Sequence, residues 1–125
     1  MTNSSEDTKV KKVILSVDDF DTGLPGVLER EGYFVVNYTI GREAVEEIRN
    51  GLHYDLALID LSLSDMGGDE VMHISKEVNP QIPIICSSGY FVKPIYADDV
   101  YQKGEKLDYL FKIIETLLTK KRAQE

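Results

Sequence analysis

Residues 54–72 read YDLALIDLSLSDMGGDEVM, and this stretch decides the fold. Its apolar run Leu56–Ile59 is too short for a buried helix and does not alternate with polar residues, a pattern typical of a strand covered on both faces. Asp60 ends the run, two glycines follow, and apolar residues continue at helical spacing from Val71. The stretch therefore predicts a buried strand, a loop and a helix, in that order.

The same order of strand and helix extends outward from this stretch. Three other short apolar runs rich in β-branched residues predict strands: Val13–Val17, Tyr33–Val36 and Ile82–Cys86. Helical spacing recurs around Ala44–Ile48 and, more weakly, around Leu24–Leu28, where glycine and proline are frequent. Alternating strands and helices predict an α/β fold, a doubly wound parallel sheet with helices on both faces.

Composition narrows the class of protein. The 125 residues suit one domain, predicted over residues 10–125 after a flexible tail at 1–9, and no apolar run approaches the length of a membrane helix. The net charge of −8 argues against nucleic acid or a membrane surface as partners. The single cysteine, Cys86, excludes an internal disulfide framework. We expect a cytoplasmic protein.

Acidic residues follow two of the predicted strands. Asp18 and Asp19 end the first strand, Asp60 ends the third, and Ser88 follows the fourth. Ligands of doubly wound sheets bind at the carboxyl ends of the strands, where carboxylates this close repel unless a cation lies among them. Oxygen ligands favour Mg²⁺, and a carboxylate beside Mg²⁺ can attack phosphorus to give an aspartyl phosphate. The alternative is that each Asp only caps a helix or forms a turn.

Four segments match one family in the same order. They are KKVILSVDDF (11–20), GYFVVNYTIGREAVEEI (32–48), YDLALIDLSLSDMGGDEVM (54–72) and IPIICSSG (82–89). The chain resembles the receiver domain of two-component response regulators, most like the single-domain type. This resemblance implies a flavodoxin-like, CheY-like fold and a stand-alone signalling switch, which is not a metabolic enzyme and at most dephosphorylates itself.

The resemblance also implies roles for individual residues. Asp60 is the phosphoacceptor, and Mg²⁺ is held by Asp18, Asp19, Asp60 and the backbone carbonyl of Ser62. Ser88 is the switch hydroxyl that bonds a phosphoryl oxygen. The implied partners are a sensor histidine kinase or histidine phosphotransferase and an unknown downstream protein. In the loop after Asp60, Ser64 replaces a usual proline, and we expect this change to touch no ligand.

The family's phosphoryl-binding lysine has two possible positions. The segment GYFVKPIYADDV (89–100) favours Lys93, which implies that the fourth helix and fifth strand are missing and that a long helix covers residues 98–122. In the alternative, residues 94–104 form the fourth helix, residues 107–111 form the fifth strand, and Lys112 is the lysine. The continuous apolar stripe over 98–122 favours Lys93.

Two further expectations follow from a rebuilt C-terminal third. An open sheet edge and surplus apolar helix surface predict a homodimer, formed on the final helices or on the edge of the fourth strand. The alternative function, from another class, is a phosphorylation-independent pseudo-receiver that serves as a protein–protein interaction or dimerisation module.

Overall fold

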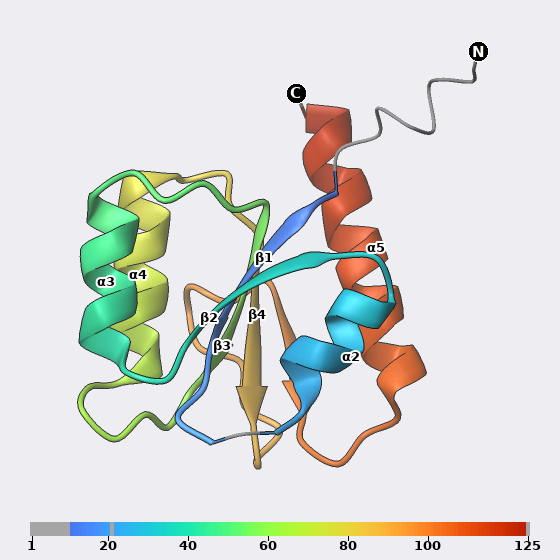
Figure 1. Ribbon diagram of the computed structural model, residues 1–125, viewed down its shortest axis with the longest axis horizontal. Helices are drawn as coiled ribbons and strands as arrows, with labels where there is room; N and C mark the ends of the chain where they lie inside the picture. The colour runs from blue at the N-terminus through green and yellow to red at the C-terminus, as the bar shows by residue number, and fades with distance from the viewer. Residues whose placement is uncertain (1–10, 21, 125) are drawn as a thin grey trace.

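The computed structural model describes residues 11–20 and 22–124, so the predicted tail at 1–9 lies outside the described residues. Five parallel strands form one sheet in the order β2-β1-β3-β4-β5 (Figure 1). The strands are β1 (Val13–Val17), β2 (Phe34–Tyr38), β3 (Leu56–Asp60), β4 (Ile84–Ser88) and β5 (Asp99–Gln102). The predicted doubly wound α/β fold is confirmed.

Helices cover both faces of the sheet. On one face lie α3 (Gly41–Arg49) and α4 (Gly68–Val78), and on the other lie α2 (Leu24–Arg30) and α5 (Leu107–Gln124) (Figure 1). Each face has its own apolar cluster, the first including Ala44 and Met72, the second including Leu28 and Leu110. Every residue of β3 is buried, as its continuous apolar run predicts. Within the described part of the chain, no helix is long and apolar enough to cross a membrane.

The first helix is short because its amino-terminal residues do not favour a helix. Gly23 precedes α2 with a φ of +77°, in the left-handed region that glycine readily adopts. Pro25 occupies the first turn, where its missing N–H is tolerated. As a result α2 has seven residues and begins well after the end of β1.

The structure corrects the prediction for residues 98–122. Asp99–Gln102 is a fifth strand, not the start of a long helix, and it pairs in parallel with β4. Val100 packs into one apolar cluster and Tyr101 into the other, so alternate residues contact opposite faces of the sheet. Gly104, with a φ of +98°, then separates the strand from the helix. The apolar residues of β5 and of α5 happen to continue at helical spacing, so the sequence pattern predicted a single helix.

The fourth helix is absent, as the favoured alignment implied, but the fifth strand is present. Residues 89–98 join β4 to β5 without helical structure. Asp98 holds the end of this connection: its N–H donates to Ile84 O at 2.7 Å, and its carboxylate accepts from Ile84 N at 2.8 Å and from Lys76 Nζ at 2.9 Å. Ten residues without a helix therefore suffice for a crossover that usually takes a dozen or more.

Part of the apolar surface predicted to be surplus is used within the fold. The edge of β4 is occupied by β5, so the predicted open fourth-strand edge is wrong. The inner face of α5 is buried in the second apolar cluster, where Leu110 and Ile114 are fully buried. The edge strands of the sheet are instead β2 and β5.

Candidate functional site

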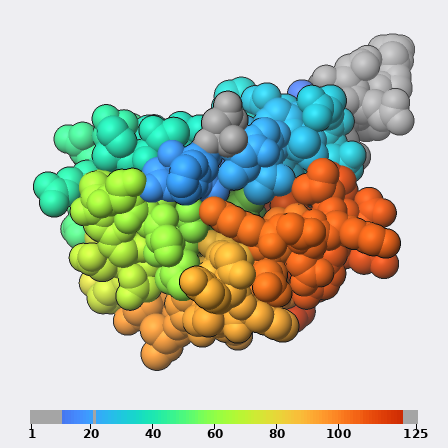
Figure 2. Space-filling view, turned by 90° about the horizontal axis from the view of Figure 1, so that it is seen from below, coloured from blue at the N-terminus to red at the C-terminus, as the bar shows by residue number. Residues whose placement is uncertain are grey.

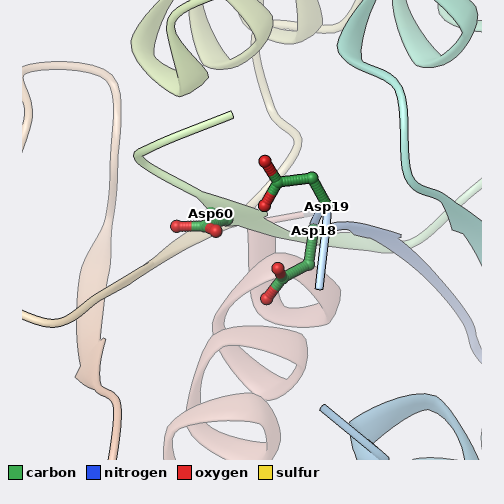
Figure 3. A group of neighbouring side chains, drawn as sticks. All are labelled: Asp18, Asp19 and Asp60. Atoms are coloured by element: carbon green, nitrogen blue, oxygen red, sulfur yellow. The ribbon is translucent and has the colours of Figure 1, made fainter. Parts of the chain in front are cut away.

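Three carboxylates meet at the carboxyl edge of the sheet. Asp18 and Asp19 follow β1, and Asp60 is the last residue of the neighbouring strand β3. One oxygen from each carboxylate lies within 4.8 Å of the others, and Figure 3 shows the side chains converging on a common space. Figure 2 views the molecule from this edge, where the blue, green and orange segments meet. The predicted acidic cluster is present.

The environment of Asp18 is unfavourable for negative charge. Asp18 and Asp60 are 8% and 3% exposed. Burial raises the pKa of Asp18 above its ordinary value, and the charge on Asp60 raises it further. A hydrogen bond from Phe20 N to Asp18 Oδ1, at 2.9 Å, and the charge on Lys103 oppose this rise without cancelling it. The site gains from any cation placed among its acids.

Lys103 supplies one cation to the site. Its Nζ lies 3.1 Å from Asp60 Oδ2 and 3.5 Å from Asp18 Oδ2. Burial lowers the pKa of Lys103, but the hydrogen bond to Asp60 and the charges on both acids outweigh burial and raise it. Lys103 is therefore a firmly protonated ammonium that neutralises part of the acidic charge.

The position of this lysine corrects the sequence prediction. Neither Lys93 nor its alternative, Lys112, is placed beside the carboxylates: both are exposed, one in the β4–β5 connection and one on α5. Lys103 follows β5, and its N–H donates to Ser88 O at 2.7 Å, which extends the ladder with β4. The signal available in the sequence was the short run Val100–Tyr101 followed by a glycine, which is too brief to identify a strand by itself.

Small residues on β4 leave room for the lysine to cross it. Lys103 directly follows β5, and its side chain reaches Asp60 on β3. The strand between β5 and β3 is β4. Asp60 and Tyr101 are both register partners of Ser87, and Gly89 follows at the end of β4. The side chain of Ser87 is too small to block the lysine's path.

A buried polar atom without a hydrogen-bond partner indicates whether a metal ion fits the site. Among the described residues, Asp19 Oδ1 is buried and has no hydrogen-bond partner. An unpartnered buried carboxylate oxygen is costly unless a ligand satisfies it. The donor set is entirely oxygen, which suits a hard cation such as Mg²⁺. The residues present therefore fit a divalent cation held by Asp18, Asp19 and Asp60.

The loop after β3 is held against these carboxylates. Ser62 N donates to Asp60 Oδ1 at 3.1 Å, and Gly68 N donates to Leu61 O at 2.9 Å. Gly68 is required here, because a Cβ at this position would lie 2.0 Å from Asp60 O. The backbone of Ser62 is thus placed next to the predicted phosphoacceptor.

Ser64 has a role that the sequence prediction missed. Its hydroxyl donates a short hydrogen bond to Asp19 Oδ2, so the change from the usual proline does touch a predicted metal ligand. The bond holds one oxygen of Asp19, while the other, Oδ1, is buried without a hydrogen-bond partner. Nothing in the spacing of Ser64 from Asp60 along the sequence predicts its contact with Asp19.

The predicted switch hydroxyl lies at the end of β4. Ser88 is 3% exposed, and its Oγ accepts a hydrogen bond from Tyr90 N at 3.0 Å. Its carbonyl accepts a hydrogen bond from Lys103 N, so Ser88 contacts both the start of the β4–β5 connection and the backbone of the lysine. The serine therefore lies within the same edge of the sheet as the three acids, one strand from Asp60.

Comparisons with known proteins agree with this geometry. A family model described as "Response regulator receiver domain" matches residues 14–122. The chain is 32% identical over 105 residues to the transcriptional regulatory protein ZraR of Escherichia coli, a match that covers 82% of this chain and 23% of ZraR. It is 29% identical over 100 residues to the response regulator receiver protein CpdR of Brucella abortus, covering 78% of this chain and 82% of CpdR.

Two solved structures are similar over most of the chain. A CheY-like response regulator receiver domain protein of Methanospirillum hungatei has 27% identity and a TM-score of 0.83, covering 93% of this chain and all (100%) of that one. The response regulator TrrA of Thermotoga maritima, in complex with Mg²⁺ and BeF, has 27% identity and a TM-score of 0.77. The match covers 85% of this chain and 98% of the TrrA chain. The chain spans only 6% of the yeast kinase RIM15, another relative, at 30% identity.

Proposed function

The chain belongs to the response regulator receiver family of two-component signalling, and we propose that it accepts a phosphoryl group on Asp60 in an Mg²⁺-dependent reaction. Receiver domains are signalling switches rather than metabolic enzymes. The observation that carries the proposal is the convergence of Asp18, Asp19 and Asp60 within 4.8 Å, with Lys103 paired to two of them. The donor is a sensor histidine kinase or a histidine phosphotransferase.

In the proposed reaction Asp60 is the nucleophile. A carboxylate oxygen of Asp60 forms a bond to phosphorus while the bond from phosphorus to the donor's imidazole nitrogen breaks, and the nitrogen keeps the electron pair. A bound Mg²⁺ would neutralise charge on the phosphoryl oxygens. The ion's ligands would be Asp18, Asp19, Asp60 and the backbone carbonyl of Ser62.

Lys103 and Ser88 are proposed to bind the product. The Lys103 ammonium, now 3.1 Å from Asp60 Oδ2, would pair with a phosphoryl oxygen once Asp60 is phosphorylated. The Ser88 hydroxyl would donate to another phosphoryl oxygen and give up its hydrogen bond from Tyr90 N. Movement of these groups would change the β4–β5 connection and thereby the binding of a downstream protein. Slow self-dephosphorylation would reset the switch.

Intact-mass measurement after incubation with acetyl phosphate and Mg²⁺ tests the proposal. We expect one added phosphoryl group, lost in Asp60→Asn and kept in Asp108→Asn, an acid in the first turn of α5. Omission of Mg²⁺ should also abolish the adduct. An unmodified wild-type mass would reject the phosphoacceptor function and favour a phosphorylation-independent interaction module.

A pair of lysine variants tests which lysine serves the site. Lys103→Met removes the ammonium beside Asp60, so we expect phosphorylation by acetyl phosphate to slow by about tenfold or more, the effect of losing one charged hydrogen bond. Lys93→Met removes the same charge from the β4–β5 connection and should leave the rate unchanged. Equal rates for the two variants would contradict the assignment of Lys103.

A further inference from the structure

A second recess lies beside the acidic site, on the face of the sheet that α2 covers. Along β1 and β2 this face is apolar at Ile14 and its register partner Val35, which pack into the second cluster. It becomes polar at the next pair on the same face, Ser16 and its partner Asn37. A sheet face that is covered by a helix is normally apolar at such positions.

The short helix α2 leaves this polar part of the face uncovered. The residues at its start, Gly23, Pro25 and Gly26, project little side-chain volume toward the sheet. A Cβ added to Gly26 would meet only Arg30 Nη1, at 3.8 Å. A cavity of about 730 Å³ results, within the range of small-molecule sites. Its lining comes from β1, β2, the loop after β1 and α2, and includes Asp18, Phe20, Gly26, Arg30, Asn37 and Thr39.

The chemistry of the lining favours an organic anion. The Arg30 guanidinium folds back over Gly26 and makes no hydrogen bond or ion pair with another described residue. Asn37 and Thr39, both exposed, offer amide and hydroxyl groups. Phe20, with 71% of its surface exposed, presents an aromatic ring. A guanidinium recognises carboxylate or phosphate, and an aromatic ring stacks on a planar group.

We propose that this cavity binds a small, hydroxyl-bearing organic phosphate, such as a nucleoside monophosphate. The phosphate pairs with Arg30, the ribose hydroxyl groups bond to Asn37 and Thr39, and the base lies against Phe20. The acidic Asp18, which also lines the cavity, favours placement of the anionic group at Arg30. The proposal does not depend on phosphorylation of Asp60.

Shared use of Asp18 links this cavity to the acidic cluster. Asp18 lines the cavity and is also one of the three clustered carboxylates. A ligand that changes the affinity of the cluster for Mg²⁺ must have its own affinity changed by Mg²⁺ by the same factor. Binding is therefore measured first without Mg²⁺, so that the cavity is tested alone.

Nuclear magnetic resonance titration of the ¹⁵N-labelled protein with AMP, without Mg²⁺, tests the proposal. We expect saturable shifts of the amides of Gly26, Arg30, Asn37 and Thr39. Arg30→Ala should weaken binding by about tenfold or more, the effect of losing a charged hydrogen bond. Arg49→Ala, which removes the same charge from the end of α3, should bind as the wild type does.

A cavity-filling variant and three further probes complete the test. Gly26→Leu fills the recess at a position with helical backbone, so it should keep the fold and lose AMP binding. If ribose 5-phosphate binds as tightly as AMP, the ligand is a sugar phosphate. If adenosine, which lacks the phosphate, binds more weakly than AMP, the result supports the role of Arg30. Inorganic phosphate binding as tightly as AMP, or no saturable shift with AMP and ribose 5-phosphate, would overturn the proposal. Asp60→Asn should bind AMP normally, which separates this result from failure of the phosphoacceptor function.

Discussion

At the scale of single residues, the site is a balance between buried acids and one lysine. Asp18 and Asp60 are buried at the end of adjacent strands, and Lys103 neutralises only part of their charge. Asp19 keeps an unpartnered buried oxygen. Functional sites often retain such unfavourable groups at the expense of stability. The protein without a divalent cation should therefore be less stable than the same fold with one acid removed.

The pKa of Asp18 makes this expectation specific. Burial, with the charge on Asp60, holds that pKa above 3.8 in the folded protein. The folded state therefore binds the Asp18 proton more tightly than the unfolded state, and stability falls as pH rises from 3.8 through the raised pKa. At neutral pH, Asp18→Asn should raise the free energy of unfolding by roughly 1 kcal/mol, or about 4 °C in Tm.

Thermal unfolding between pH 4 and 8, without Mg²⁺, measures this difference. The advantage of Asp18→Asn over the wild type should shrink as pH falls through the raised pKa, because the wild-type carboxyl becomes neutral too. Glu46→Gln, an exposed acid on α3, should change Tm little at any pH. Mg²⁺ should raise Tm of the wild type more than that of Asp18→Asn. A variant less stable than the wild type at pH 7 would contradict the assigned balance of charges.

At the scale of elements, loops and short connections place the site. The loop from β3 to α4 approaches Asp60 so closely that only glycine fits at position 68. The connection from β4 to β5 is held at its end by Asp98, which bonds to the start of β4 and to Lys76 of α4. These contacts replace the support that a helix between β4 and β5 would give to the fifth strand.

Gly68→Ala tests the close approach of the β3–α4 loop. A Cβ 2.0 Å from Asp60 O requires the backbone to move, so we expect a loss of about 3 kcal/mol or more in the free energy of unfolding. Gly89→Ala is the matched control, because a Cβ there meets nothing within 4 Å, and its effect should stay within about 0.5 kcal/mol. Urea unfolding measures both variants. Similar midpoints would show that the loop can shift away from Asp60 at little cost.

At the scale of the whole molecule, the connection that replaces a helix exposes apolar side chains. Tyr90 and Phe91 are each 75% exposed and Ile95 is 88% exposed, although β5 covers the edge of β4 and the inner face of α5 is buried. Apolar residues gathered in this way on an otherwise charged surface often mark an interaction site. The predicted homodimer cannot use the edge of β4, which β5 occupies, and we propose these exposed side chains as its surface.

Light scattering across a range of protein concentrations tests this homodimer. We expect the wild type to form dimers at high micromolar concentration and the double variant Phe91→Ser, Ile95→Ser to remain monomeric, because it lacks the exposed apolar surface. Val78→Ser removes a 50% exposed apolar residue at the end of α4 and should dimerise as the wild type does. A monomeric wild type at the highest concentration would reject the homodimer.

The sequence by itself determined the parts of the protein whose signals are local. The strand Val13–Val17 has the predicted bounds, and the strand predicted at Leu56–Ile59 is longer by a single residue. Both runs are largely apolar without regular alternation and too short for a buried helix, which is typical of strands covered on both faces. The parallel topology then brings Asp18, Asp19 and Asp60 to one edge of the sheet. For these three acids, order along the chain is sufficient to predict proximity.

Only the tertiary structure decided where the fifth strand lies and which lysine reaches the acidic site. Val100 and Tyr101 form a strand because they pair with β4, bury on opposite faces and follow the anchored Asp98. None of these stabilising contacts is local, so the same residues fitted a helical stripe equally well. Lys103 reaches Asp60 across Ser87 of β4, and the spacing of these residues along the chain does not predict that contact.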